Sequence, residues 1–311
     1  MSGPPGTAPI VHIGYHKTAT TWLQDELFPL AASHEFVPRK VTQTAFLAPP
    51  GLHFDAATAR EVLGIAGRER PVLLSEENLS GYLHNGGLHG LVGPEMARRI
   101  HAALPDAQVV VFIRNQLDIL RAAYAQYVSG GGTWGQARYF DSASRVRGAL
   151  TRAWKAPVFE FEHFEFDRLI ACYDALFGAE RVHVYPYEWL SDREALIARL
   201  QADLDLAFTG RPAAGKRSNP SLGSVSMALV RFANLFTRQS VVNKSWLVDL
   251  PGGQVLRHAA KRAARHVPFA NRSPARLPDA VRERALALYA PGNRRLAEGR
   301  GLPLSALGYP L

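Results

Sequence analysis

Short apolar runs alternate with longer amphipathic segments along the first two thirds of the chain. Four runs are almost entirely apolar, at 10–14, 71–75, 108–113 and 181–185. Segments with apolar residues at near-helical spacing lie around them, at 21–32, 56–66, 93–104, 115–128, 164–177 and 192–203. Short apolar strands separated by helices are typical of a parallel sheet that is buried on both faces. The pattern therefore predicts a three-layer α/β fold, in which a parallel sheet is flanked by helices.

The pattern changes in the last third of the chain. A loop rich in glycine, proline and serine occupies 210–221. Helical spacing then returns at 221–240, 253–266 and 278–298. We expect a single domain over 1–311 that consists of two parts, an α/β core at 8–206 and a mostly helical C-terminal extension at 207–311.

Composition narrows the class of protein further. The chain has 311 residues, of which 47% are hydrophobic and 20% charged, so it can bury a large core. Its single cysteine, Cys172, excludes an internal disulfide and a multi-cysteine zinc site. The N-terminus has no signal-peptide pattern, and no window is apolar enough to span a membrane, so we expect a soluble, cytoplasmic, bacterial protein. The net charge of +9 favours anionic ligands without identifying one.

Two other groups of residues carry less information about function. The run 159–167 alternates aromatic and acidic residues, which predicts a half-buried strand that packs into the core. The carboxylates Asp203 and Asp205, and the imidazoles of His84 and His89, lack the spacing of metal ligands. We therefore expect structural or solvated roles for them and predict no metal site.

Polar residues follow each predicted strand, where ligands gather in parallel sheets. A lysine, backbone amides at a helix N-terminus and threonine hydroxyls can surround a phosphate group. The loop is not a Walker A motif, because only Gly14 precedes Lys17 closely. The alternative is that the threonines only cap the helix and that Lys17 is solvated. The residues after the four runs are His16-Lys17-Thr18-Ala19-Thr20-Thr21, Glu76-Glu77, Arg114-Asn115 and Tyr187-Glu188.

Residues 17–23, Lys-Thr-Ala-Thr-Thr-Trp-Leu, resemble the 5′-phosphosulfate loop of the sulfotransferases that use 3′-phosphoadenosine 5′-phosphosulfate (PAPS). This loop departs from the family pattern only at Ala19, where the family has glycine. Residues 114–124 are similar to the family's second signature, Arg-Asn-Pro-x-x-x-x-x-Ser-x-Tyr, except for Gln116 and Ala122. Tyr187-Glu188 is similar to a third family motif, so that the resemblance spans roughly 9–205.

This resemblance implies a P-loop-like α/β fold and a donor site for PAPS. In the family the first motif holds the 5′-phosphosulfate and the second the 3′-phosphate. A hydroxyl that binds the 3′-phosphate is missing at Ala122, and Arg121, Ser129 or the basic loop near 216–218 can replace it. At Ala19 a negative φ tolerates the methyl group, whereas a left-handed turn opposes it. The implied donor-binding residues are Lys17, Thr18, Ala19, Thr20, Thr21, Trp22, Arg114, Asn115, Ala122, Tyr187, Lys216, Arg217 and Ser218.

The resemblance also implies transfer of a sulfuryl group to a hydroxyl or amine, without a metal, with release of 3′-phosphoadenosine 5′-phosphate (PAP). Lys17 is placed to stabilise the charge that develops on the bridging oxygen. For the general base we prefer Glu77 to Glu76, because an aromatic residue, Tyr82, follows it five positions later as in family members. His16 is a further candidate base. The alternative for both glutamates is that they cap the following helix.

Two other functions stay open. A small-molecule or nucleotide kinase would require a glycine before Lys17 and a strand-end aspartate for magnesium, and neither is evident. A non-catalytic nucleotide-binding or partner-binding homologue is supported by the departure at Ala122. We expect a nucleotide donor and an acceptor such as a carbohydrate, lipid or small metabolite, and no nucleic acid or membrane span. The sequence identifies neither the acceptor nor the oligomeric state.

Overall fold

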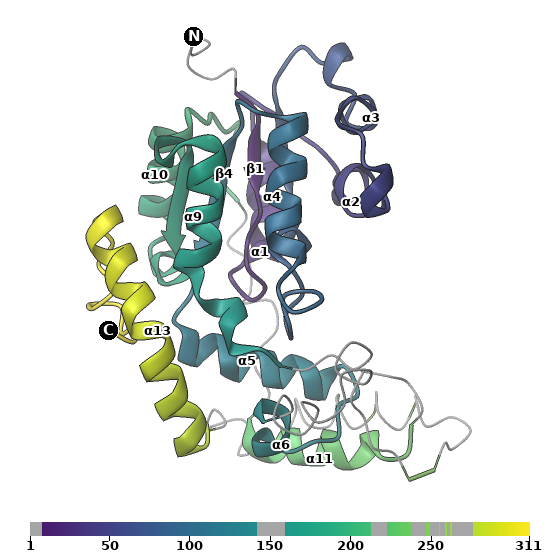
Figure 1. Cartoon of the computed structure of the whole chain (residues 1–311), viewed down its shortest axis with the longest axis vertical. Helices are drawn as coiled ribbons and strands as arrows, with labels where there is room; N and C mark the ends of the chain where they lie inside the picture. Colours follow the sequence, from purple (N-terminus) through teal and green to yellow (C-terminus); the bar gives the residue numbers. More distant parts are fainter. Residues whose placement is uncertain are drawn as a thin grey trace.

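A five-stranded parallel sheet forms the centre of the protein, with β1 in the middle of the order β2-β3-β1-β4-β5 (Figure 1). This computed structural model describes residues 8–141, 159–212, 223–237, 247, 248, 255, 259, 262 and 276–311. His12 in β1 is paired with Ser75 in β3 and with Val110 in β4. The strands are β1 (Ile10–His12), β2 (Glu35–Phe36), β3 (Val72–Ser75), β4 (Gln108–Ile113) and β5 (Val182–Pro186).

Helices cover both faces of the sheet, because successive strand residues alternate between two cores. In β4, Val109 and Val111 join the larger core, whereas Val110 and Phe112 join the smaller one. The larger core is covered by α2 (Arg39–Phe46), α3 (Ala56–Val62), α4 (Val92–Ala103) and α9 (Phe166–Phe177). The smaller is covered by α10 (Arg193–Leu204) and by the helical segment that begins with α1 (Thr20–Trp22). The three-layer α/β prediction is confirmed, with a loop and helix after the central strand as in P-loop-like folds.

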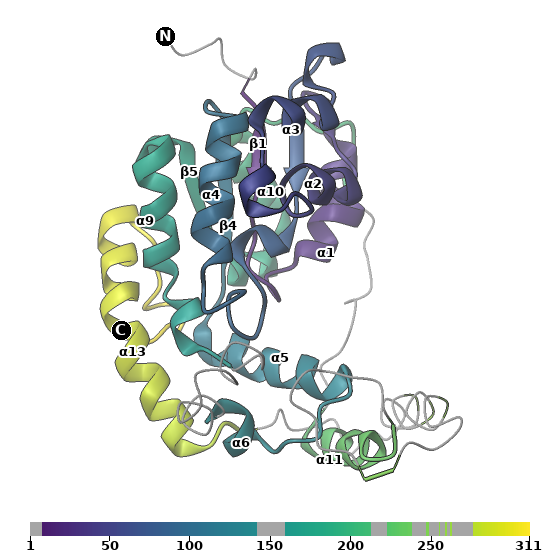
Figure 2. The same cartoon turned by 45° about the vertical axis from the view of Figure 1, so that its right-hand side comes forward.

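A further set of helices lies beyond the carboxyl ends of the strands, with α5 closest to the sheet (Figures 1 and 2). These helices are α5 (Gln116–Ser129), α6 (Gln136–Phe140) and α11 (Ser224–Asn234). The long helix α13 (Asp279–Arg300) runs beside α9 and α5. Its arginines form ion pairs with residues around α9, namely Arg295 with Asp167, Arg300 with Asp174 and Arg284 with Glu162. The expected division at residue 206 stays a prediction.

Several elements differ in detail from the sequence-based expectations. The first helix continues from α1 as a π-helix at Leu23–Leu27 and a 3₁₀-helix at Phe28–Leu30. The strand expected at 159–167 is wrong, because the chain forms a 3₁₀-helix at Phe161–Phe164 and then enters α9. A 3₁₀-helix repeats every three residues, so Phe161 and Phe164 share one side and are both buried. The predicted role of these aromatic residues in the core is therefore confirmed.

Other segments were missed or lie outside the described residues. Strand β2 and helix α2 were not predicted. Of the helix expected at 221–240, residues 223–237 are described and contain α11; of the helix expected at 253–266, only residues 255, 259 and 262 are described. The remaining 3₁₀-helices are Gly51–His53, Ile65–Gly67, Glu77–Ser80, Ala179–Arg181 and Tyr187–Ser191.

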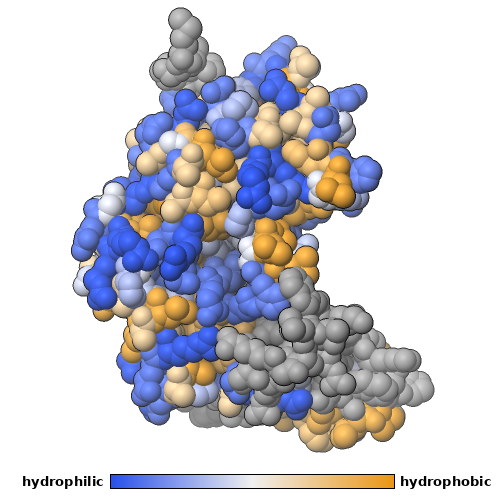
Figure 3. All heavy atoms as spheres, viewed as in Figure 1, coloured by the Kyte–Doolittle hydropathy of each residue, from blue (hydrophilic) through white to orange (hydrophobic). Residues whose placement is uncertain are grey.

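The molecular surface is mixed in character. The face seen in Figure 3 carries mostly hydrophilic side chains, interrupted by smaller hydrophobic groups. Among the described helices, none combines the length and the apolar character that crossing a membrane requires.

Candidate active site at the carboxyl ends of the strands

The loop after β1 makes a tight turn that uses two left-handed residues. Lys17 and Ala19 both have a φ of 68°. Left-handed residues within a turn direct backbone N–H groups toward one side, which suits an anion. At Ala19 the sequence-based condition for easy acceptance of the methyl group is not met, since φ is positive. An L-residue in this conformation costs roughly 1–2 kcal/mol, and the surrounding loop has to offset that cost.

The three threonines of the loop differ in their environment. The hydroxyl of Thr18 is buried and donates to the carbonyl oxygen of Tyr15, so it stabilises the turn. Thr21 is exposed at the start of α1. Thr20 is only 3% exposed, and its Oγ1 has no hydrogen-bond partner within the described residues. The indole nitrogen of Trp22 is also buried without one. An unpaired buried hydroxyl is costly, so Thr20 is suited to donate to an anion held by the loop.

Lys17 reaches from the loop to α5. Its Nζ donates to Oε1 of Gln126 over 2.7 Å. Burial lowers the pKa of Lys17 below its usual value, and the nearby Arg114 charge lowers it further, while Glu77 opposes both effects. The ammonium group is therefore partly desolvated, next to one cation and one anion.

Arg114, directly after β4, brings the second predicted motif to the first. Its Nη1 donates to the carbonyl oxygen of Lys17 over 3.0 Å. The guanidinium lies over the ring of Tyr187, 4.3 Å from its centre. Its Nε is buried and has no hydrogen-bond partner in the described part of the chain. The structure thus brings Lys17, Arg114 and Tyr187 together, as expected for residues that follow neighbouring parallel strands.

Asn115 acts mainly within the protein itself. Its Oδ1 accepts from the backbone N–H of Leu117 at the start of α5, and its Nδ2 donates to the carbonyl oxygen of Gly308 over 2.6 Å. Its backbone N–H donates to Oε1 of Glu188 over 2.9 Å. The other carboxylate oxygen of Glu188 accepts from the hydroxyl of Tyr309 over 2.8 Å. The end of β4 is thereby attached to a segment far along the chain.

The two departures in the second motif have different surroundings. Gln116, in place of proline, is fully buried and exchanges two amide hydrogen bonds with Asn293 of α13, over 2.7 and 3.0 Å. Ala122 is partly exposed on α5. Of the residues proposed to replace its hydroxyl, Arg121 forms an ion pair with Asp118 at 2.7 Å. Ser129 is the last residue of α5, and Lys216, Arg217 and Ser218 lie outside the described residues.

The two adjacent glutamates are in very different environments. Glu76 is fully buried and accepts hydrogen bonds from Arg39, Gln43 and the backbone and side chain of Asn78. Burial alone raises the pKa of Glu76, but hydrogen bonds from Arg39, Asn78 and Gln43 outweigh it and lower the pKa. Glu77 keeps 24% of its side chain exposed and accepts one bond, from Arg39 at 3.3 Å. Glu77 therefore has lone pairs to offer, whereas those of Glu76 are occupied.

His16 lies beside Glu77, with its Nε2 4.0 Å from the carboxylate. This nitrogen also lies 3.2 Å from Oδ1 of Asn78, whose Nδ2 donates to Glu76 over 2.7 Å. An amide oxygen only accepts, so Nε2 of His16 carries a proton. The remaining nitrogen, Nδ1, is buried, and burial lowers the pKa of His16. The imidazole thus offers a protonated nitrogen toward Glu77, which makes it a weaker candidate base than Glu77.

Sequence reasoning missed several contributors to this site. Arg39 and Gln43 belong to the eight-residue helix α2, whose amphipathic pattern could have indicated a helix there. Asn78 lies two residues after Glu76 and could have been recognised as a polar side chain beyond a strand end. Gln126 lies one helical turn after Ala122, on the same side of α5, and that spacing could have identified it.

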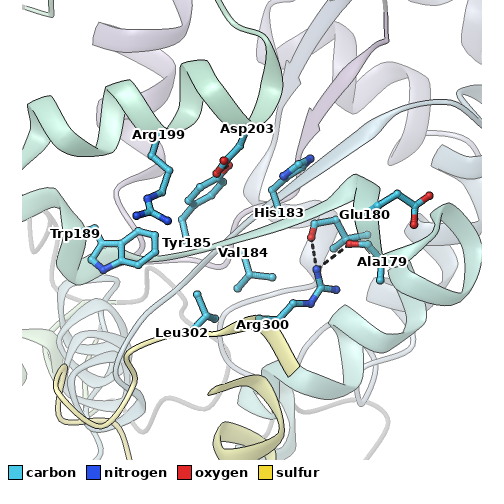
Figure 4. Close-up of a pocket in the computed structure, with 11 residues that line it drawn as sticks. Ala179, Glu180, His183, Val184, Tyr185, Trp189, Arg199, Asp203, Arg300 and Leu302 are labelled. Atoms are coloured by element: carbon cyan, nitrogen blue, oxygen red, sulfur yellow. Dashed lines mark hydrogen bonds between the residues drawn. The ribbon is translucent and has the colours of Figure 1, made fainter. Parts of the chain in front are cut away.

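A surface pocket of about 230 Å³ lies elsewhere, along the outer edge strand β5 (Figure 4). Arg199 and Trp189 stand on one side, and Arg300 on the other, where it donates to the carbonyl oxygens of Ala179 and Val182. None of the predicted site residues lines this pocket. Within the described ranges, no group of three or more His, Cys, Asp or Glu side chains could hold a metal ion.

No family model and no curated protein matches this chain. Among solved structures, a sulfotransferase from Alicyclobacillus acidocaldarius has 19% sequence identity and a TM-score of 0.49, covering 68% of this chain and 87% of its own. The sulfotransferase domain from the curacin biosynthetic pathway has 13% identity and a TM-score of 0.36, covering 90% of this chain and 97% of its own.

Proposed function

We propose that the protein is a sulfotransferase that moves the sulfuryl group of PAPS to a hydroxyl or amine of an acceptor. One observation carries this proposal. Two motifs that are 97 residues apart in the chain meet through the hydrogen bond between Arg114 and the backbone of Lys17. The motifs follow the neighbouring strands β1 and β4, so the two donor-binding signatures of the resemblance lie in one site.

The residues present fit such a donor. The 5′-phosphosulfate would be held by Lys17, by the backbone amides of the loop and by the unpaired hydroxyl of Thr20. Arg114, whose Nε is buried and unpaired among the described residues, would hold the 3′-phosphate. Lys17 and Arg114 are cationic hydrogen-bond donors, so the site suits a ligand that carries anionic groups.

The proposed chemical step follows from these positions. The acceptor oxygen or nitrogen attacks the sulfur and forms a new bond to it, while the bond from sulfur to the bridging oxygen breaks. The electron pair of that bond remains on the phosphate of PAP, where the Lys17 ammonium stabilises the added charge. Glu77 accepts the proton that the attacking group loses. Glu76 instead holds α2 against the strand end through Arg39.

Binding experiments test the proposal directly. PAP should raise the unfolding midpoint of the protein, whereas ATP with magnesium should not, because selective binding to the native state stabilises it. Stabilisation by ATP with magnesium alone would favour a kinase. PAP binding without turnover of PAPS, with or without acceptor, would favour the non-catalytic homologue.

A second measurement tests the assignment of Arg114. Replacing Arg114 by alanine should weaken PAP far more than adenosine 5′-phosphosulfate, which lacks the 3′-phosphate. Equal losses for the two ligands would show that Arg114 does not bind that phosphate. Arg276→Ala is the matched control, because Arg276 is exposed and pairs with Asp279.

A further inference from the structure

A chain of polar side chains adjoins the loop after β1 that carries Lys17 and Ala19. His12, the last residue of β1, is completely buried, and its Nδ1 lies 2.7 Å from Oγ of Ser75. That hydroxyl also accepts from Nε2 of Gln24 over 3.1 Å. The imidazole is packed edge-on against Phe28 and Phe112, with both ring centres 5.6 Å away. A phenylalanine would fill such a place without a polar group, so the polar atoms of His12 call for an explanation.

The other ring nitrogen of His12 faces the loop. Nε2 has no hydrogen-bond partner among the described residues, and Oγ1 of Thr20 has none either. Both lie beside Gly14, since a Cβ placed there would be 2.4 Å from Nε2 and 3.3 Å from Oγ1. Gly14 is therefore required by the His12 ring, and the two unpaired groups flank the same point in the core.

Hydrogen-bond accounting selects the position of the imidazole proton. The Ser75 hydroxyl accepts from Gln24, and Nδ1 of His12 is its one hydrogen-bond partner among the described residues that can accept its proton, so the hydroxyl donates to Nδ1. Nε2 then carries the proton of a neutral ring. Burial lowers the pKa of His12 to about 3, although the charge of Glu76 opposes this effect, so the ring is neutral at pH 7.

We propose that His12 is a positioning residue of the anion site, whose Nε2–H donates to Oγ1 of Thr20 when the loop holds its ligand. This inference rests on the proposed function, because the ligand is the 5′-phosphosulfate of PAPS or the 5′-phosphate of PAP. A hydroxyl that accepts from His12 must direct its own proton elsewhere, and the anion is the available acceptor. The chain Gln24, Ser75, His12 thus fixes which way Thr20 donates, before any charge develops.

Two measurements test this assignment. Nitrogen-15 NMR at pH 7 should show His12 as the neutral Nε2–H form, identified among the 11 histidines by its absence from a His12→Phe spectrum. A proton on Nδ1 instead would overturn the proposal. This readout needs no ligand, so it decides the position of the proton even if PAP does not bind. Absence of PAP binding to the unmodified protein would count against the proposed function and would leave the NMR result standing.

A double-mutant cycle tests the coupling to Thr20. His12→Phe should weaken PAP roughly three- to tenfold in the unmodified protein and have almost no further effect in a Thr20→Val background. If the losses of PAP affinity from the two single substitutions multiply in the double variant, His12 acts independently of Thr20, through packing alone, and the proposal fails. If His12→Phe does not fold, Ser75→Ala replaces it in the cycle, and the His12 signal is then identified by its shift in the Ser75→Ala spectrum. The Ser75→Ala variant should shift the His12 proton partly to Nδ1. It should weaken PAP binding in the protein that has Thr20 and not in the Thr20→Val background.

Discussion

The ammonium of Lys17, in the loop after β1, donates to the side-chain oxygen of Gln126 in α5 over 2.7 Å. A lysine has three donors, so this bond can persist while the other two face an anion. Gln126 therefore orients a charge that the proposed reaction uses, from a position one helical turn beyond the alanine that departs from the family pattern.

Replacing Gln126 separates orientation from charge. Gln126→Ala should lower turnover about two- to tenfold, as expected for one exposed hydrogen bond worth about 0.5–1.5 kcal/mol, and leave PAP affinity nearly unchanged. Gln126→Glu should weaken PAP more than the alanine variant does, because a carboxylate neutralises the lysine and repels the phosphate. Calorimetric titration with PAP ranks the two variants. The reverse order would show that Lys17 does not face the anion.

Lys17 should set the alkaline limit of activity. Its pKa is below the usual value of 10.5, chiefly through burial, so the proton is lost at a lower pH than from a free lysine as pH rises through the lowered pKa. Turnover should therefore fall on the alkaline side. Lys17→Arg should remove that fall because the guanidinium stays charged, and Lys17→Ala should lower turnover by about a hundredfold or more at every pH. A pH–rate profile of the three proteins tests this, and an unchanged alkaline limb in Lys17→Arg would assign it to another group.

Replacement by glutamine should affect turnover at Glu77 and stability at Glu76. Glu77→Gln should lower turnover strongly with PAP affinity intact, because it removes the proposed base and few internal contacts. Glu76→Gln should instead reduce the stability of the fold by about 1.5–3 kcal/mol, because the buried charge-assisted bonds from Arg39 weaken. Denaturant unfolding and PAPS turnover, measured on both variants, distinguish the roles. Wild-type turnover in Glu77→Gln would eliminate Glu77 as the base.

Ala19 provides a test of backbone strain. Ala19→Gly should relieve roughly 1–2 kcal/mol of left-handed strain, partly offset by the greater freedom of glycine in the unfolded chain. We expect unchanged or slightly higher stability, and PAP binding that is retained or tighter. Ala19→Val should destabilise the protein, since a branched side chain fits this φ poorly. Thermal unfolding of the two variants and the unmodified protein should give midpoints that decrease in the order glycine, alanine, valine. A clear loss of stability in the glycine variant would contradict the left-handed geometry.

The sheet could be predicted because its strands are short, apolar and buried on both faces. Runs such as 108–113 leave little choice of structure, and the polar residues that follow parallel strands must meet at one edge. Strand β2 has only two residues, Glu35 and Phe36, which are too few for a periodic pattern. Its existence depends on pairing with β3, which the local sequence does not encode.

The same distinction applies within the site. Lys17 and Arg114 could be expected to meet, because each follows a strand. The difference between Glu76 and Glu77 could not be predicted, since it depends on Arg39 and Gln43, which approach from a helix that only the tertiary fold places there. The left-handed conformation of Ala19 is likewise imposed by the turn, against the preference of the residue itself.

The hydrogen bond from Asn115 to Gly308 joins positions 193 residues apart, and the pairing of Gln116 with Asn293 spans 177. Contacts of such separation require the closure of very long loops, so they are expected to form late in folding. The strand end that carries Arg114 would then become rigid only after α13 has docked. A transient detachment of α13 would loosen this strand end while the sheet remains folded, so amide hydrogen exchange at 115–118 should be faster than in β4 itself.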